Sequence, residues 1–323
     1  MHASMPDHHE EEVQSADGTT IGYRQLGRGA GVILVHGGMK TSQDFMTLAA
    51  ALSDAFTVYV VDRRGRGLSG PHGAGYSVAK EVDDVQALVA GTGARYIFGL
   101  SSGALVTLRA ALATPALERI ALYEPPFSID GSVATSWLGR YEQELAHDDP
   151  AAAVVTALQG MRVEPMFVRL PRPILVPVLR LLMRLQGDGD AEDVPIRVLA
   201  PTLRHDLEIV KEMSDTLDEY NDLQARVLLL GGSRSLPFLN VSLDGLERTL
   251  PRVERATLPG LGHDGPENDG KPELVAQQLL RFFAERAPDL PALGVGTVRE
   301  AAEAGEEGWR CPARPVSGER LVR

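Results

Sequence analysis

The chain has 323 residues, 44% of them hydrophobic and 24% charged, which is enough apolar material for a large buried core. Its formal net charge of −12 argues against nucleic acid as the main partner, because binding phosphates requires a basic surface. The single cysteine, Cys311, excludes an intrachain disulfide and a cysteine-based zinc site. Residues 1–12 lack the apolar run of a secretory signal, so we expect a flexible tail there and a cytoplasmic protein.

Strand-like and helix-like segments alternate along most of the chain. Two alternating runs flank Asp17-Gly18, a pair that favours a hairpin turn. The strands expected after this hairpin are at residues 31–38, 57–62, 95–100, 119–124, 226–232 and 253–260. The helices expected between and after them are at residues 44–56, 77–91, 103–113, 240–251 and 273–287. This order predicts an α/β fold with a mostly parallel sheet and crossover helices.

The alternation stops between residues 127 and 222, where helical periodicity is broken by prolines. We interpret this segment as a helical lid inserted into a core of residues 13–126 and 223–287, with a C-terminal extension at 288–323. Within the lid, residues 166–186 are strongly apolar, but recurring arginines and three prolines argue against an integral membrane segment. We expect a helix that packs on the core and roofs a pocket with apolar surface and some positive charge. Such a pocket fits a largely apolar substrate with an anionic or polar end.

Residues 99–103 read GLSSG, between an expected strand and an expected helix. This matches G-x-S-x-G in the strand–turn–helix context where the motif carries a nucleophile. Ser101 holds the central position, and the flanking glycines remove the Cβ atoms that would clash at a strained turn. The backbone N–H of Ser102 would then donate to an oxyanion, with a second donor from Gly38 or Met39 in the loop after the first buried strand.

A serine hydroxyl needs a base to become nucleophilic. The chain has eight histidines, and His263 alone lies in a loop after a late core strand. His36 follows the first buried strand, where we expect it to support backbone geometry. His263 is therefore the predicted general base.

Four motifs occur in order: HGG after a buried strand, DRRGRGLSG, GLSSG and LPGLGHDGP. Together they resemble the α/β-hydrolase superfamily, over Val13 to about Ala287. The resemblance implies a serine-nucleophile enzyme with a lid. It also implies that the turn starting at Asp62 is structural, which agrees with a strand-end aspartate acting as a cap.

The superfamily usually places the triad acid after the strand that follows the insertion, but residues 233–235 read Ser-Arg-Ser. Glu124 lies just past the strand that follows the nucleophile helix, and catalytic groups gather at such strand ends in open α/β sheets. Some relatives take their acid from that strand, and the order serine, acid, histidine is preserved. Glu124 is therefore the predicted acid. The other candidates are Asp264, Asp244 and Asp206.

These residues predict a serine hydrolase of esterase, lactonase or thioesterase type that forms an acyl-enzyme on a small-molecule substrate. The alternatives are an acyltransferase, or a lyase, cyclase or cofactor-free oxygenase that uses His263 as a base, or a non-catalytic ligand-binding protein. The chain contains no phosphate-binding glycine loop and no metal-ligand spacing such as H-E-x-x-H, so we expect no cofactor and no metal. The pattern leaves the substrate and the oligomeric state open.

Overall fold

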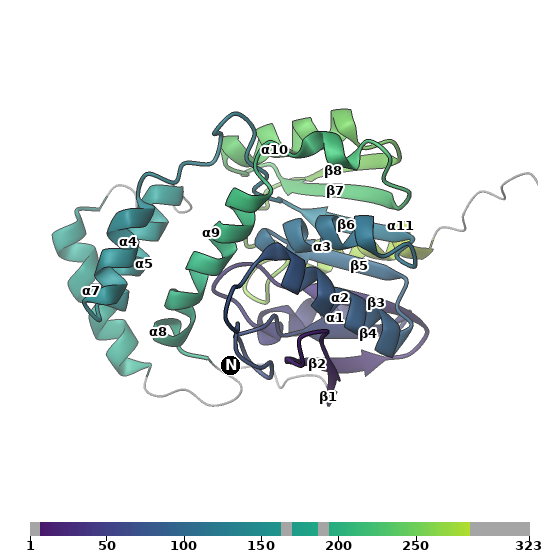
Figure 1. Ribbon diagram of the computed structural model, residues 1–323, viewed down its shortest axis with the longest axis horizontal. Helices are drawn as coiled ribbons and strands as arrows, with labels where there is room; N and C mark the ends of the chain where they lie inside the picture. The colour runs from purple at the N-terminus through teal and green to yellow at the C-terminus, as the bar shows by residue number, and fades with distance from the viewer. Residues whose placement is uncertain (1–6, 163–169, 187–193, 285–323) are drawn as a thin grey trace, which may run out of the picture. The chain divides into compact units, whose positions relative to one another are not determined.

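The computed structural model describes residues 7–162, 170–186 and 194–284. Eight strands form one sheet in the order β1-β2-β4-β3-β5-β6-β7-β8 (Figure 1). The strands are β1 (His9–Gln14), β2 (Thr20–Gly27), β3 (Ala30–Val35), β4 (Phe56–Val61), β5 (Tyr96–Leu100), β6 (Arg119–Tyr123), β7 (Arg226–Gly232) and β8 (Val253–Leu258). β2 runs antiparallel to both of its neighbours, and every other pair is parallel. The predicted α/β fold with a mostly parallel sheet is confirmed.

Helices cover both faces of this sheet. The helices of the α/β core are α1 (Met46–Leu52), α2 (Val78–Thr92), α3 (Ser102–Ala113), α10 (Pro237–Thr249) and α11 (Pro272–Ala284). Alternate side chains of each central strand point to opposite faces, so Ile33 packs toward α2 and α3, whereas Leu34 packs toward α1 and α11. Burial on both faces explains why these strands read as continuous apolar runs.

The hairpin predicted at Asp17-Gly18 joins β1 to β2, with Gln14 paired to Thr20. β1 begins at His9, so residues 9–12, which we expected in a flexible tail, belong to the sheet. They gave no strand signal because their side chains are exposed and polar. The strand is held by main-chain pairing with β2 and by an ion pair of Glu10 with Arg24. Residues 1–6 and the expected extension at 288–323 lie outside the described residues.

Helices also fill the segment between β6 and β7. They are α4 (Leu138–Ala146), α5 (Pro150–Met161), α7 (Arg172–Leu185), α8 (Ile196–Leu199) and α9 (Leu203–Glu212), with short 3₁₀ turns η2 (Ala200–Thr202) and η3 (Leu217–Tyr220); the remaining 3₁₀ turn, η1 (Ser42–Phe45), precedes α1. α5 packs against α4 and α7, whereas α9 lies against α3 and α2 of the core (Figure 1). α9 therefore connects this segment to the helix that begins beside Ser101.

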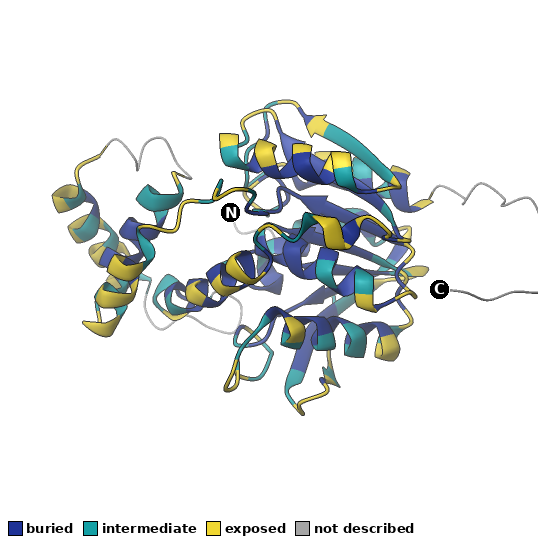
Figure 2. Cartoon of the chain, turned by 45° about the horizontal axis from the view of Figure 1, so that its top comes forward, coloured by how far each residue is buried: buried dark blue, intermediate teal, exposed yellow. Residues whose placement is uncertain are grey.

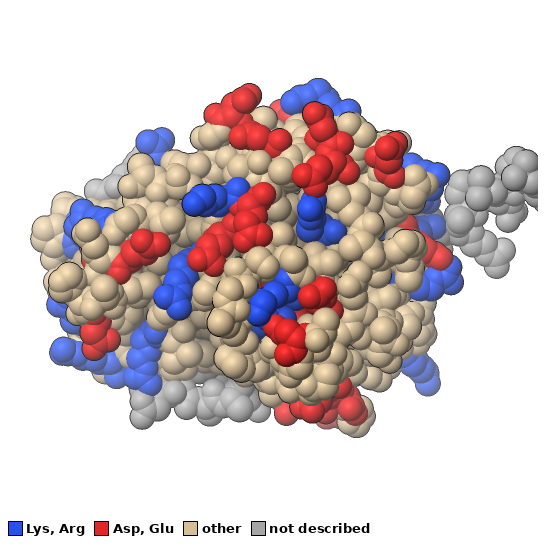
Figure 3. Space-filling view, viewed as in Figure 1, with Lys and Arg blue, Asp and Glu red and all other residues tan. Residues whose placement is uncertain are grey.

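The position of α7 corrects one expectation. Of residues 166–186, the first four lie outside the described residues, and α7 packs on α5 rather than on the α/β core. It buries Leu175 and Met183 and leaves a row of apolar side chains exposed (Figure 2). Pro177 lies inside the helix. None of the helices in the described part of the chain has the length and apolar character needed to cross a bilayer. On the face in Figure 3, acidic side chains lie beside basic ones.

Candidate active site

The turn between β5 and α3 has the strained geometry expected of G-x-S-x-G. Ser101 has φ 55° and ψ −124°, a conformation that non-glycine residues rarely adopt. A Cβ atom on Gly99 would lie 2.5 Å from the carbonyl oxygen of Gly103, and one on Gly103 would lie 2.3 Å from that of His36. Both glycines are therefore required for the backbone to turn this tightly. The turn presents Ser101 at the C-terminal edge of the sheet.

The loop after β3 lies against this turn. A Cβ atom on Gly37 would be 3.1 Å from the Cβ of Ser101. His36 is fully buried and accepts a hydrogen bond from the Arg63 backbone N–H at 3.1 Å, as its predicted structural role requires. Burial lowers the pKa of His36 well below its usual value, so the ring is neutral. Within the described residues, the backbone N–H groups of Gly38 and Met39 make no hydrogen bond; Gly38 lines the pocket, whereas Met39 is not among its lining residues.

Glu124 and His263 are brought together from loops 139 positions apart in sequence, with His263 Nδ1 2.7 Å from Glu124 Oε2. The Glu124 side chain has no exposed area, and that of His263 is 28% exposed. Burial alone would raise the pKa of Glu124, but the hydrogen bond and charge of His263, with further donors, hold it below the usual value. An ionised carboxylate only accepts hydrogen bonds, so Nδ1 carries a proton, and in the neutral form of the ring Nε2 is left as an acceptor.

The second oxygen of Glu124 is held by the end of β7. Its Oε1 accepts hydrogen bonds from the Gly232 backbone N–H at 2.8 Å and from the Ser235 hydroxyl. Ser235 lies within the stretch that lacks the usual acid, so this stretch supplies a donor to Glu124. Ser235 was not predicted, because its contact with Glu124 depends on the pairing of β6 with β7, which the chain order alone does not give.

Two further contacts fix the loop that carries His263. The Tyr123 hydroxyl donates to the Gly262 carbonyl at 2.7 Å. A Cβ atom on Gly232 would lie 2.1 Å from the Leu261 carbonyl oxygen, so glycine is needed for this loop to approach β7. Tyr123 was also missed, since its position inside an apolar strand predicts only core packing.

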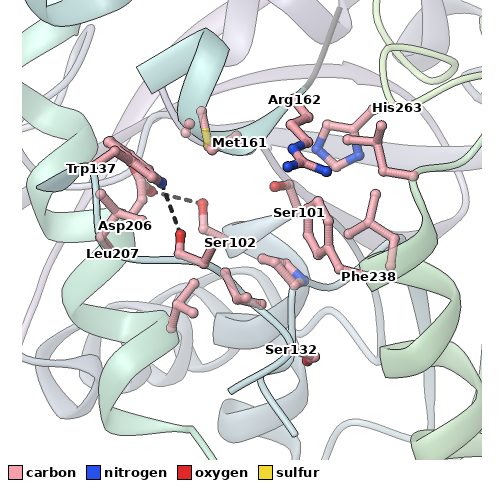
Figure 4. A pocket seen from close by; sticks show the side chains of 18 of the residues that line it. Ser101, Ser102, Ser132, Trp137, Met161, Arg162, Asp206, Leu207, Phe238 and His263 are labelled. Atoms are coloured by element: carbon pink, nitrogen blue, oxygen red, sulfur yellow. Dashed lines mark hydrogen bonds between the residues drawn. The ribbon is translucent and has the colours of Figure 1, made fainter. Parts of the chain in front are cut away.

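Ser101 and His263 line the same pocket, whose volume is about 590 Å³ (Figure 4). The segment between β6 and β7 provides about two thirds of the lining residues. Its larger apolar side chains there are Val133, Trp137, Met161, Leu203, Leu207 and Val210. The described residues 170–186 contribute none of the lining, so our expectation that they roof the pocket is wrong. The expected positive charge comes instead from Arg162, at the end of α5.

Asp206 on α9 is the second buried carboxylate of the site. It accepts hydrogen bonds from Ser102 Oγ at 2.7 Å, from Arg63 at 2.7 Å and from Arg66 at 2.6 Å (Figure 4 shows the Ser102 contact). Burial opposes its charge, but Arg66 and Arg63 together lower the pKa of Asp206 to about 2. Asp206 is thus committed to the arginines and Ser102 rather than to His263.

The other two acidic candidates, Asp244 and Asp264, make no contact with the His263 ring like that of Glu124. Asp244 pairs with Arg255 at the surface. Asp264 follows His263 directly in sequence, and it is Glu124 that pairs with the His263 ring.

The turn that starts at Asp62 is held by buried hydrogen bonds. Asp62 is buried and accepts hydrogen bonds from Ser42 and Arg24, in line with a structural turn. Arg63 and Arg66 of the same turn reach the pocket wall through Asp206, a contact that the motif alone did not predict. In the described part of the chain, no cluster of His, Cys, Asp and Glu could hold a metal ion.

The fold agrees with comparison to known proteins. Residues 32–278 match the model of the alpha/beta hydrolase family, and the chain belongs to that family and is a hydrolytic enzyme. It is 26% identical over 268 residues to the 2-(acetamidomethylene)succinate hydrolase of Mesorhizobium japonicum, covering 82% of this chain and 91% of that one. The N-formylmaleamate deformylase of Pseudomonas putida is 37% identical over 123 residues, or 36% of this chain and 46% of that one. A solved alpha/beta hydrolase from Sphaerobacter thermophilus superposes with a TM-score of 0.67 at 29% identity, covering 84% of this chain and all of that one.

Proposed function

We propose that the chain is a serine hydrolase in which Ser101, His263 and Glu124 form the catalytic triad. The observation that carries the proposal is the contact of His263 with Glu124: Oε2 of the buried Glu124 carboxylate lies 2.7 Å from Nδ1 of His263. His263 lines the same pocket as Ser101, which lies at a strained turn. This pairing leaves Nε2 as the proton acceptor that a serine nucleophile needs.

In the proposed reaction, Ser101 Oγ attacks the substrate carbonyl carbon and His263 Nε2 takes the hydroxyl proton. The Ser102 backbone N–H, with that of Gly38 or Met39, donates to the oxyanion that forms. The intermediate collapses to an acyl-enzyme and releases the leaving group, which receives the proton from His263. A water molecule then repeats the sequence and frees the acid and Ser101. Glu124 orients the imidazole and stabilises its charged form throughout.

The segment between β6 and β7 serves as the lid in this proposal, because it provides most of the apolar lining of the pocket that Ser101 shares. The apolar side chains that this segment contributes to the pocket favour a substrate whose acyl or alcohol part is small to medium in size and largely apolar. The names of the Mesorhizobium and Pseudomonas relatives, a 2-(acetamidomethylene)succinate hydrolase and an N-formylmaleamate deformylase, extend the proposed bond class from esters to amides.

Labelling with a fluorophosphonate probe tests this function without knowledge of the substrate. We expect wild-type protein to gain one adduct on Ser101, located by peptide mass spectrometry, and Ser101→Ala to gain none. His263→Ala should be labelled far more slowly while keeping the wild-type circular dichroism spectrum. A folded wild-type protein that stays unlabelled would contradict the acyl-enzyme mechanism and favour chemistry that uses His263 as a base alone.

A further inference from the structure

Arg162 occupies a specific position at the rim of the pocket. It caps the C-terminus of α5, where its backbone N–H donates to the Leu158 carbonyl, and it has a left-handed conformation with φ 56°. A left-handed residue turns the chain sharply out of a helix, and glycine or asparagine is the usual choice there. Arg162 is neither glycine nor asparagine, so the left-handed backbone gives no reason for an arginine at this position. The location of its guanidinium group does.

Arg162 lines the same pocket as Ser101 and His263. Figure 4 draws Arg162, His263 and Ser101 on one side and Trp137 and Leu207 toward the other. Arg162 therefore provides a positive charge where a substrate would place the atoms around its scissile bond.

The Arg162 guanidinium has no partner among the residues that the structure describes. It makes no side-chain hydrogen bond and no ion pair with them, whereas the backbone N–H of Arg162 is bonded to Leu158. The other charged group of fixed sign in the lining, Asp206, is neutralised by Arg63 and Arg66. The Asp206 carboxylate thus offers little repulsion to an incoming anion, and Arg162 remains to attract one.

From these observations we infer that Arg162 binds a carboxylate of the substrate, an inference that rests on the proposed serine hydrolase function. The substrate class is a carboxylic ester or amide whose acyl part carries a second, ionised carboxyl group. A guanidinium presents paired N–H donors that match a carboxylate, and a single arginine suffices for one negative charge. The apolar remainder of the substrate contacts Trp137 and Leu207.

The experiment compares matched anionic and neutral esters. The anionic set is the monomethyl esters of succinate, glutarate and adipate. In the neutral set an isopropyl group replaces the free carboxylate, which keeps size and shape. We expect wild-type kcat/KM to favour the anionic member of at least one pair by about tenfold or more, as a charge-assisted hydrogen bond provides. The length of the best pair measures the span from Ser101 to Arg162.

Three variants separate charge from backbone effects. Arg162→Asn removes the charge but suits the left-handed backbone, and it should abolish the preference mainly through KM. Arg162→Lys should retain part of it. Arg184→Gln removes an exposed arginine of α7 outside the pocket lining and should leave the preference unchanged. Glutarate should also protect Ser101 from the fluorophosphonate probe in wild type but not in Arg162→Asn, a readout that needs no turnover.

Two results distinguish failure of this inference from failure of the proposed function. If Ser101 is labelled normally but Arg162→Asn keeps the wild-type preference and the protection by glutarate, Arg162 is a solvated rim residue and the inference is overturned. If Ser101 is not labelled in folded wild-type protein, the proposed function fails, and the inference fails with it.

Discussion

Ser235 donates a hydrogen bond from the end of β7 to Glu124 at the end of β6. The strand end that lacks the usual acid thus holds the carboxylate that we propose as the triad acid. The same Glu124 oxygen also accepts from the Gly232 backbone N–H, while the other faces His263. Three donors converge on one buried carboxylate, which explains why its pKa is held low despite burial. Glu124 is therefore held in its ionised form by its neighbours.

Ser235→Ala should weaken this support without removing the acid. One donor to an ionised carboxylate is lost while Gly232 and His263 remain, so we expect kcat/KM to fall by about tenfold with little change in KM. The matched control is Ser233→Ala, because Ser233 accepts a hydrogen bond from Gly260 and does not contact Glu124. Steady-state kinetics on one ester decide the question. Equal activities of the two variants would show that the Ser235 hydroxyl does not support catalysis.

Gly103→Ala should destabilise the protein. The new Cβ atom would lie 2.3 Å from the His36 carbonyl oxygen, a backbone atom that cannot move aside cheaply. We expect the free energy of unfolding to fall by about 1–3 kcal/mol, as overpacking costs elsewhere. Gly139→Ala on α4 is the control, because its Cβ meets nothing within 4 Å and alanine favours helix, so stability should rise by up to ~1 kcal/mol. Urea unfolding of both variants provides the comparison, and an undiminished unfolding midpoint for Gly103→Ala would contradict the described turn.

Asp206→Asn should lower stability in a pH-dependent way. The pKa of Asp206 is about 2 in the folded chain, below the ordinary 3.8, so ionised Asp206 stabilises the fold above pH 4. This stabilisation, about 2 kcal/mol for a shift of this size, is lost as pH falls from 4 toward 2. Urea unfolding at pH 7 should show a deficit of that order or larger, since Arg63 and Arg66 lose a partner, and the deficit should shrink in acid. Asp244→Asn at the surface should change stability by less than ~0.5 kcal/mol. A deficit that does not vary with pH would count against the ion pairs.

The central strands and the Ser101 turn were predictable from sequence because their signals are local. Strands buried on both faces read as apolar runs, and the glycines around Ser101 are within two positions of it. β1 was missed because its exposed side chains carry no hydrophobic pattern. The contacts of Ser235 with Glu124 and of Asp206 with Ser102 join residues 111 and 104 positions apart. They depend on strand order and helix packing, which no local pattern encodes.

Arg162 illustrates the same limit at the pocket. From the composition of residues 166–186 we expected positive charge at the pocket and placed it on that stretch. The arginine that lines the pocket is Arg162, which precedes the stretch. α7 has arginines and exposed apolar residues, but none of its residues lines the pocket. Arg162 reaches the lining because α5 ends there in a left-handed turn, and helical periodicity does not predict such a turn.

The most direct test of the account is the kcat/KM of Glu124→Gln on an ester that the wild-type enzyme hydrolyses, measured beside Asp244→Asn as a carboxylate control. If Glu124 orients and stabilises the His263 imidazole, Glu124→Gln should lose roughly 10³–10⁴-fold in kcat/KM while its circular dichroism spectrum and cooperative unfolding stay like those of the wild type. Asp244→Asn should keep wild-type activity. A Glu124→Gln variant that is folded and within tenfold of wild type would contradict the assignment of Glu124 as the triad acid.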